Sequence, residues 1–165
     1  MNNPVIGLIP QKTTMDQNKA KTPGAVSDTI ELCLEIAFEA HRGQRDLDGN
    51  PVILHPLSVG LAGTTPDEQC AGFLHDVVED TDYTFEDLLE RGVPTAVVDV
   101  LRLLTHKKGT DYMDYVRAIA RSGNKTAIAV KTNDLHHNLE RGRRGGYTRL
   151  VEKHTAALNE LSALT

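Results

Sequence analysis

Apolar residues recur at intervals of three to four positions along most of the chain. In the first such stretch, Ile30, Leu34 and Phe38 fall on one face of a helix, and Gly43 marks its end. Similar amphipathic segments follow, and no run of Val, Ile and Thr alternates strictly with polar residues. The pattern therefore predicts an all-α fold, in which a bundle of helices buries its apolar faces in one core.

Capping residues and prolines divide this pattern into separate helices. Thr65 followed by Pro66 is a start signal, because threonine caps a first turn and proline is tolerated at the first helical position. The helix that Asn124 opens is expected to run through Leu139, and the basic, glycine-rich residues 141–146 are expected to form a flexible loop. Further helix starts are expected at Pro56, Thr84, Pro94, Asp111 and Tyr147.

Residues 1–26 differ from the rest of the chain. They carry three prolines and several polar runs, so we expect a poorly ordered N-terminal arm. Residues 27–165 are expected to form one domain, because a chain of 165 residues is long enough for a single substantial core. The two cysteines, Cys33 and Cys70, lie in apolar stretches and are expected to be buried, reduced thiols.

The charge and the hydropathy of the chain exclude some classes of function. A formal net charge of −5 argues against broad binding to nucleic acid, which needs a cationic surface. It does not exclude an anionic small-molecule ligand, because a metal ion and a few local cations can invert the field inside one pocket. No stretch approaches the roughly 18–20 apolar residues of a membrane span, and the N-terminus lacks a secretory signal. A cytoplasmic protein without membrane contact is therefore expected.

The sequence FLHDVVEDT, residues 73–81, is dense in groups that bind metals. On one helix His75 and Glu79 would share a face, and Asp76 and Asp80 would share the neighbouring face. Carboxylates so close together repel one another, and a bound cation would remove that conflict. The alternative is a solvated acidic stripe at a helix end.

Two further candidate ligands lie elsewhere in the chain. His55 precedes Pro56, where it could also be a cap or a surface group. Asp134 lies in an otherwise apolar helix and needs a partner there, which Lys131 could supply as an ion pair; Asn138 lies on the same side. Two imidazoles and two carboxylates together suit a divalent ion such as Mn, Fe, Co, Ni or Zn.

Such a metal would leave coordination positions for water and for a phosphate oxygen. A bound metal ion lowers the pKa of its water and neutralises charge that builds up on phosphorus. Glu79 or Asp80 would be placed to orient that water or to accept its proton.

Five blocks of sequence, in this order, resemble the HD superfamily of metal-dependent phosphohydrolases. Within it, they are similar to the hydrolase domain of RelA/SpoT-type alarmone enzymes and to the stand-alone small alarmone hydrolases. The resemblance spans about two thirds of the chain, from about Ile30 to Leu139. The blocks are EAHRGQ (39–44), GNPVILHP (49–56), GFLHDVVEDTDYT (72–84), LLTHKKG (103–109) and VKTNDLHHNL (130–139).

The resemblance implies a role for each matching residue. Glu79 and Asp80 match the acidic pair that activates and positions the attacking water. Asn138 matches a position near the bound nucleotide, and Lys131 is a candidate contact to a phosphate. Arg45 is the basic residue next to the turn that meets the substrate in this family. The implied metal ligands are His55, His75, Asp76 and Asp134.

The resemblance also implies the chemistry. The metal would be Mn²⁺, and the reaction would remove pyrophosphate from the 3′ position of a guanosine polyphosphate, the alarmone of the stringent response. Alarmone hydrolases usually carry a basic pair where this chain has Asp46 and Leu47, and an acidic residue facing a polyphosphate is unfavourable.

Two alternatives therefore remain open: a phosphohydrolase for another nucleotide, and a non-catalytic module that binds a nucleotide or a metal. The acidic pair argues against the second, because a pure binder needs no group that positions water. The oligomeric state is left open. The remaining histidines are expected to be structural: His41, His106, His136, His137 and His154.

Overall fold

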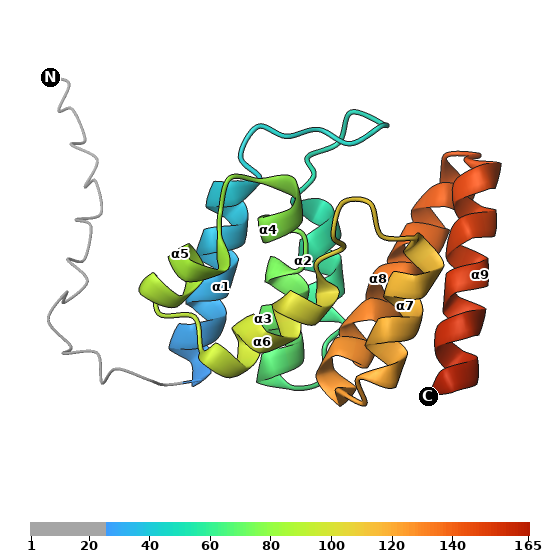
Figure 1. Ribbon diagram of the computed structural model, residues 1–165. Helices are drawn as coiled ribbons and strands as arrows, with labels where there is room; N and C mark the ends of the chain where they lie inside the picture. The colour runs from blue at the N-terminus through green and yellow to red at the C-terminus, as the bar shows by residue number, and fades with distance from the viewer. Residues whose placement is uncertain (1–25) are drawn as a thin grey trace, which may run out of the picture.

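The computed structural model describes residues 26–165, which form α-helices joined by short loops (Figure 1). Within that range there is no β-strand, which confirms the all-α prediction. The predicted arm lies outside the described residues except for Val26, which begins the first helix. The helices are α1 (Val26–Ala40), α2 (Leu54–Leu61), α3 (Pro66–Leu74), α4 (Val77–Asp80), α5 (Phe85–Glu90), α6 (Thr95–Leu104), α7 (Tyr112–Arg121), α8 (Lys125–Arg144) and α9 (Thr148–Leu164).

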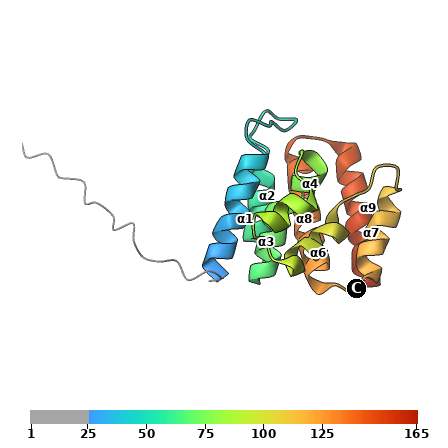
Figure 2. The same ribbon diagram turned by 60° about the vertical axis from the view of Figure 1, so that its left-hand side comes forward.

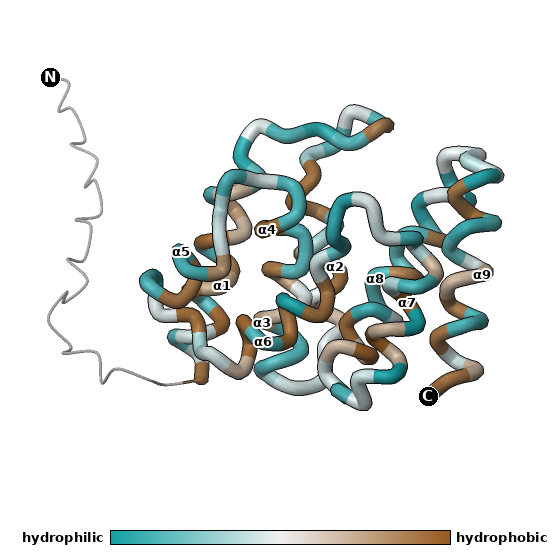
Figure 3. Tube along the Cα trace, viewed as in Figure 1, coloured by the Kyte–Doolittle hydropathy of each residue, from teal (hydrophilic) through white to brown (hydrophobic). Residues whose placement is uncertain are grey.

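Local capping explains where several of these helices begin. The side chains of Thr65, Thr84, Asp111 and Asn124 each accept a hydrogen bond from a backbone N–H in the following turn. These bonds satisfy donors that a helix leaves unpaired at its start. The amphipathic character is visible in Figure 3, where hydrophobic and hydrophilic segments alternate along α6, α7 and α9.

Helix α3 lies in the middle of the core and packs against α1, α2, α6 and α8. Phe73 and Leu74 on this helix are almost completely buried. Helices α2 and α3 approach very closely, because a Cβ added at Gly72 would lie only 2.6 Å from the Cα of Gly60. The four-residue connection makes α2 and α3 a helical hairpin, so the start of α2 lies beside the end of α3.

Helix α8 continues to Arg144, so the prediction of a flexible loop from residue 141 is wrong for its first four residues. The reason lies in Gly142, which faces α9. A Cβ at this position would lie 2.9 Å from Cγ2 of Val151, so the glycine allows the two helices to pack closely. Gly146, with a φ of +72°, then turns the chain into α9.

The α1–α2 loop (residues 41–53) projects beyond the helical body (Figure 2). An isolated antiparallel bridge between Arg45 and Pro51 closes its outer part. At the loop tip (residues 46–50), the side chain of Asp46 accepts hydrogen bonds from the backbone N–H groups of Asp48 and Asn50.

The sequence predictions about cysteines and membrane spans can also be compared with the structure. Cys33 and Cys70 are buried, and neither forms a disulfide, as predicted. Among the helices of residues 26–165, none is long and apolar enough to cross a membrane.

Candidate metal centre

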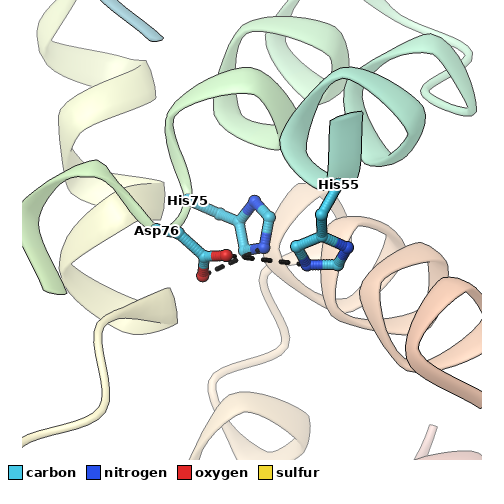
Figure 4. Close-up of side chains that lie close together, drawn as sticks. All are labelled: His55, His75 and Asp76. Carbon is cyan, nitrogen blue, oxygen red and sulfur yellow. Dashed lines mark ion pairs between the residues drawn. The ribbon is translucent and has the colours of Figure 1, made fainter. Parts of the chain in front are cut away.

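His75 and Asp76 lie in a short link between α3 and α4, not within the single helix that the sequence suggested. In a continuous helix, neighbouring side chains point about 100° apart. In the link, the Nε2 atom of His75 lies 3.1 Å from Oδ1 of Asp76. The break in the helix therefore lets both side chains face the same point (Figure 4).

Three of the four predicted metal ligands, His55, His75 and Asp76, offer atoms that all lie within 4.8 Å of one another, and Asp134 lies beside the two histidines. His55 comes from the start of α2, and its Nε2 atom lies 3.1 Å from Oδ1 of Asp134 on α8. The same nitrogen lies 3.5 Å from Oδ2 of Asp76, and Nε2 of His75 lies 3.8 Å from Oδ1 of Asp134. His55, His75 and Asp134 are buried, and Asp76 is partly exposed. The fold thus brings two imidazoles and two carboxylates together from distant parts of the sequence.

The ring of His75 is prepared to bind a cation. Its Nδ1 atom lies 2.8 Å from the carbonyl oxygen of Gly72, which can only accept, so Nδ1 carries the proton. In the neutral ring Nε2 then presents a lone pair toward the carboxylates of Asp76 and Asp134, and within residues 26–165 this buried atom forms no hydrogen bond. Burial lowers the pKa of His75, but Asp76 and Asp134 outweigh this effect and raise it well above its usual value. The two carboxylates thus create a field that a divalent cation would satisfy.

Lys131 and Asn138 fix the carboxylate of Asp134. Nζ of Lys131 lies 2.7 Å from Oδ2, and Nδ2 of Asn138 donates to Oδ1 at 2.5 Å. Burial alone would raise the pKa of Asp134, but the charge of Lys131 and the nearby imidazoles hold it well below its usual value. The ion pair that the sequence offered as an alternative is present, and it leaves Oδ1 facing the two histidines.

His137 orients the other imidazole ligand. Its Nδ1 atom lies 2.7 Å from Nδ1 of His55. Burial and the neighbouring His55 lower the pKa of His137 to about 4, so its ring is neutral near pH 7 and one nitrogen can accept. If His137 accepts, Nδ1 of His55 donates and Nε2 of His55 is free to bind a metal. Histidine ligands in metal sites are commonly oriented in this way.

The four predicted ligands line a cavity of about 330 Å³, called here the metal cavity. Glu79 and Asp80 line it on the side of α4. The opposite wall consists of aromatic and basic side chains from α7, α8 and α9, namely Tyr112, Tyr115, Lys131, Lys153 and His154.

The comparisons with known proteins agree with this geometry. No protein-family model matches the chain. It is 33% identical over 147 residues to a GTP pyrophosphokinase of Streptomyces coelicolor, which covers 83% of this chain and 17% of that protein. It is 32% identical over 116 residues to a guanosine-3′,5′-bis(diphosphate) 3′-pyrophosphohydrolase of Haemophilus influenzae, over 63% of this chain and 17% of that protein. The chain thus spans about a sixth of the length of these two relatives.

Among solved structures, the chain resembles a metazoan ortholog of SpoT that hydrolyzes ppGpp and plays a role in starvation responses. The TM-score is 0.61 with 26% sequence identity, over 88% of this chain and 96% of that chain. This chain is an HD-type domain of the RelA/SpoT hydrolase-like family.

The acidic pair of this HD domain is divided between two environments. Oε2 of Glu79 accepts a hydrogen bond from the backbone N–H of His106, at 2.9 Å. Among residues 26–165 no backbone N–H donates to the carboxylate of Asp80, and burial, together with the charges of Asp76 and Glu79, raises its pKa. Glu79 is thus fastened to the chain after α6, whereas the surroundings of Asp80 favour its protonated form more than water would.

The predicted substrate contacts of the HD domain are only partly brought together. Lys131 and Asn138 line the metal cavity. Arg45 instead lines a separate depression with His41 and Pro51, so it is not among the residues around the metal ligands.

Several residues of the HD domain's cavity are not among the site residues predicted from the sequence. His137 is predicted to be structural, but it contacts the predicted ligand His55. Arg141 was assigned to a loop, but it lies on α8 and lines the metal cavity. The spacing of seven residues from Asp134 would have placed Arg141 on the same helix face, had the helix been extended far enough. Lys153, whose Nζ lies 3.8 Å from the centre of the Tyr112 ring, carried no local signal.

Proposed function

We propose that the chain is a metal-dependent pyrophosphohydrolase that acts on guanosine 3′,5′-bis(diphosphate) and releases pyrophosphate from its 3′ position. The observation that carries the proposal is the convergence of four metal-binding side chains beside an acidic pair in one cavity. The names of two relatives and the activity of the metazoan ortholog support the choice of substrate.

His55, His75, Asp76 and Asp134 would hold the ion, which we propose to be Mn²⁺; Fe, Co, Ni or Zn would also suit these ligands. When bound, a divalent ion lowers the pKa of coordinated water and neutralises charge on the reacting phosphate. The buried, unpartnered Nε2 of His75 fits such a group.

Asp80 is proposed to accept the proton of the attacking water, and Glu79 to orient that water. Water attacks the phosphorus that is attached to the ribose 3′ oxygen. A new P–O bond forms as the bond to the 3′ oxygen breaks, pyrophosphate leaves, and the 3′ oxygen takes up a proton. Lys131 and Asn138 keep Asp134 in place during this exchange.

A specific observation favours a second candidate, hydrolysis of a different nucleotide by the same machinery. Asp46, an acidic residue, lines the metal cavity where a polyphosphate would approach. The third reading, a module that binds without turnover, leaves the acidic pair Glu79 and Asp80 beside the predicted ligands without a use.

A panel of nucleotides tests the proposal. The purified chain is loaded with Mn²⁺ and incubated with guanosine 3′,5′-bis(diphosphate) and with ordinary nucleoside di- and triphosphates, and the products are separated by chromatography. We expect pyrophosphate and GDP from the first substrate, and no products from a double variant with Glu79→Ala and Asp80→Ala. Turnover of another nucleotide alone would establish the second candidate instead.

Other expectations from the sequence stay predictions. They are a cytoplasmic location, the absence of a nucleic-acid partner, and the contact between Arg45 and the substrate. Metal analysis of the purified protein would check the identity of the ion and its expected stoichiometry of about one per chain.

A further inference from the structure

Helix α8 presents a row of polar side chains along one face. Lys131, Asp134, Asn138 and Arg141 follow one another at spacings of three, four and three residues, and all line the metal cavity. At 1.5 Å per residue, Arg141 lies about 10 Å along the helix axis from the metal ligand Asp134. The row therefore starts at the metal centre and leads away from it.

Arg141 is held in place by the α1–α2 loop. Its Nη2 atom lies 3.2 Å from Oδ2 of Asp46, across 95 positions of sequence. The other oxygen of Asp46 accepts the backbone N–H groups of Asp48 and Asn50. The carboxylate is thus fully engaged, whereas a guanidinium has five N–H donors and keeps several for a ligand.

The pair lies at the junction of two cavities. Asp46, Arg141 and His55 line both the metal cavity and a neighbouring cavity of about 650 Å³. The second cavity has an apolar side formed by leucines of α2, and it also contains Arg144. A ligand that reacts at the metal centre and extends along α8 must pass Arg141.

We propose that Arg141 binds the 5′ phosphates of the nucleotide while its 3′ end reacts, and that Asp46 is the positioning residue for this guanidinium. Arg141 would then be a specificity-determining residue, and the proposal rests on the proposed function. The proposal also explains why an acidic residue lies in a site for an anion. The positive charge of Arg141 neutralises the carboxylate of Asp46, and the carboxylate orients the guanidinium of Arg141. The positive charge that the loop lacks at positions 46 and 47 comes from α8 instead.

Steady-state kinetics with two substrates test the role of Arg141. Guanosine 3′,5′-bis(diphosphate) carries 5′ phosphates, and guanosine 3′-diphosphate does not. For Arg141→Gln we expect the KM of the first to rise about 10-fold or more, because a charge-assisted hydrogen bond is lost. Its kcat should stay within about 2-fold, and the KM of the second should barely change. Arg143→Gln, an exposed arginine of the same helix turn, is the matched control and should leave both substrates unaffected.

A double-mutant cycle tests the role of Asp46. Asp46→Asn should raise the KM of guanosine 3′,5′-bis(diphosphate) several-fold while Arg141 is present, because the guanidinium loses its orienting charge. In the Arg141→Gln background the same change should have no further effect. Equal effects in both backgrounds would show that Asp46 acts only on the loop and would overturn its positioning role.

Calorimetric binding of GDP and of guanosine separates this inference from the proposed function, because neither ligand is turned over. Arg141→Gln should weaken GDP binding about 10-fold and leave guanosine binding unchanged. That result would support the inference even if the nucleotide panel showed no turnover. The inference is overturned if GDP does not bind the wild type, or if Arg141→Gln and Arg143→Gln bind GDP with the same affinity. It is also overturned if Arg141→Gln weakens the binding of guanosine as much as that of GDP, because Arg141 would then contact the nucleoside and not the phosphates.

Discussion

The metal centre and the loop tip (residues 46–50) face the same cavity but are held in opposite ways. At the predicted metal centre, three of the four predicted ligands have a partner on the helical body: His75 has Gly72, His55 has the half-buried His137, and Asp134 has Lys131. The loop tip is largely exposed, and in the described part of the chain two side-chain pairs tie it to the helical body, Arg141–Asp46 on α8 and Tyr147–Asp48 at the start of α9. Groups that must meet an ion with accurate geometry are fixed by the core, whereas groups that select a ligand lie on a projecting loop that can vary at little cost.

The largest effect is expected from removing a ligand of the buried region. Asp134→Ala should abolish metal binding and lower kcat/KM by at least about 10³-fold, because a ligand and the partner of two other groups are lost. Metal content after dialysis and nucleotide turnover measure this. Asp99→Ala, an exposed acid on α6, should change neither. Full metal content in Asp134→Ala would remove Asp134 from the ligand set.

The next largest effect should separate the two acids of α4. Asp80→Asn should lower kcat by about 10²–10³-fold with metal content unchanged, since a general base typically contributes that much. Glu79→Gln should lower kcat by a smaller factor, because the amide oxygen of the glutamine can still accept a hydrogen bond from the backbone N–H of His106. Single-turnover rates of the two metal-loaded variants decide between them. A greater loss with Glu79→Gln would exchange the proposed roles.

A smaller effect should come from the support of His55. His137→Phe should weaken metal binding about 10- to 100-fold, because outer partners of a ligand histidine commonly contribute that much. A competition titration against a chelator measures the affinity. His136→Phe changes the neighbouring, exposed histidine and should leave the affinity as it is. Equal affinities for the two variants would mean that His137 has only a packing role.

The smallest effect belongs to the loop tip. Tyr147→Phe removes the hydrogen bond to Asp48 on an exposed surface. The free energy of unfolding should change by less than about 0.5 kcal/mol, and the metal affinity should not change. Denaturant unfolding with a parallel metal titration measures both. A loss of metal affinity would show that the loop tip supports the metal centre. It would contradict the view that the two regions are held independently.

The sequence by itself determined the local features of this protein. Apolar spacing and capping residues such as Thr65 and Asn124 fixed the all-α class and several helix starts, because helices form from contacts within a few residues. The four candidate ligands were also found from the sequence, chiefly because the family blocks occur in order. Without these blocks, the residues next to His55 and Asp134 in the sequence are equally compatible with other roles. His55 could be a helix cap or a surface group, and Asp134 could be the ion-pair partner of Lys131.

Tertiary structure alone decided the features that depend on distant partners. Helix α8 continues through Gly142 because α9 packs against that glycine, and nothing near it in sequence announces this. The link at His75 and Asp76 turns two neighbouring side chains toward His55, and His137 meets His55 across 82 positions. Arg141 meets Asp46 across 95 positions. Hydrophobic periodicity specifies which face of a helix is buried, but only the packing of all helices determines which polar groups of different helices meet.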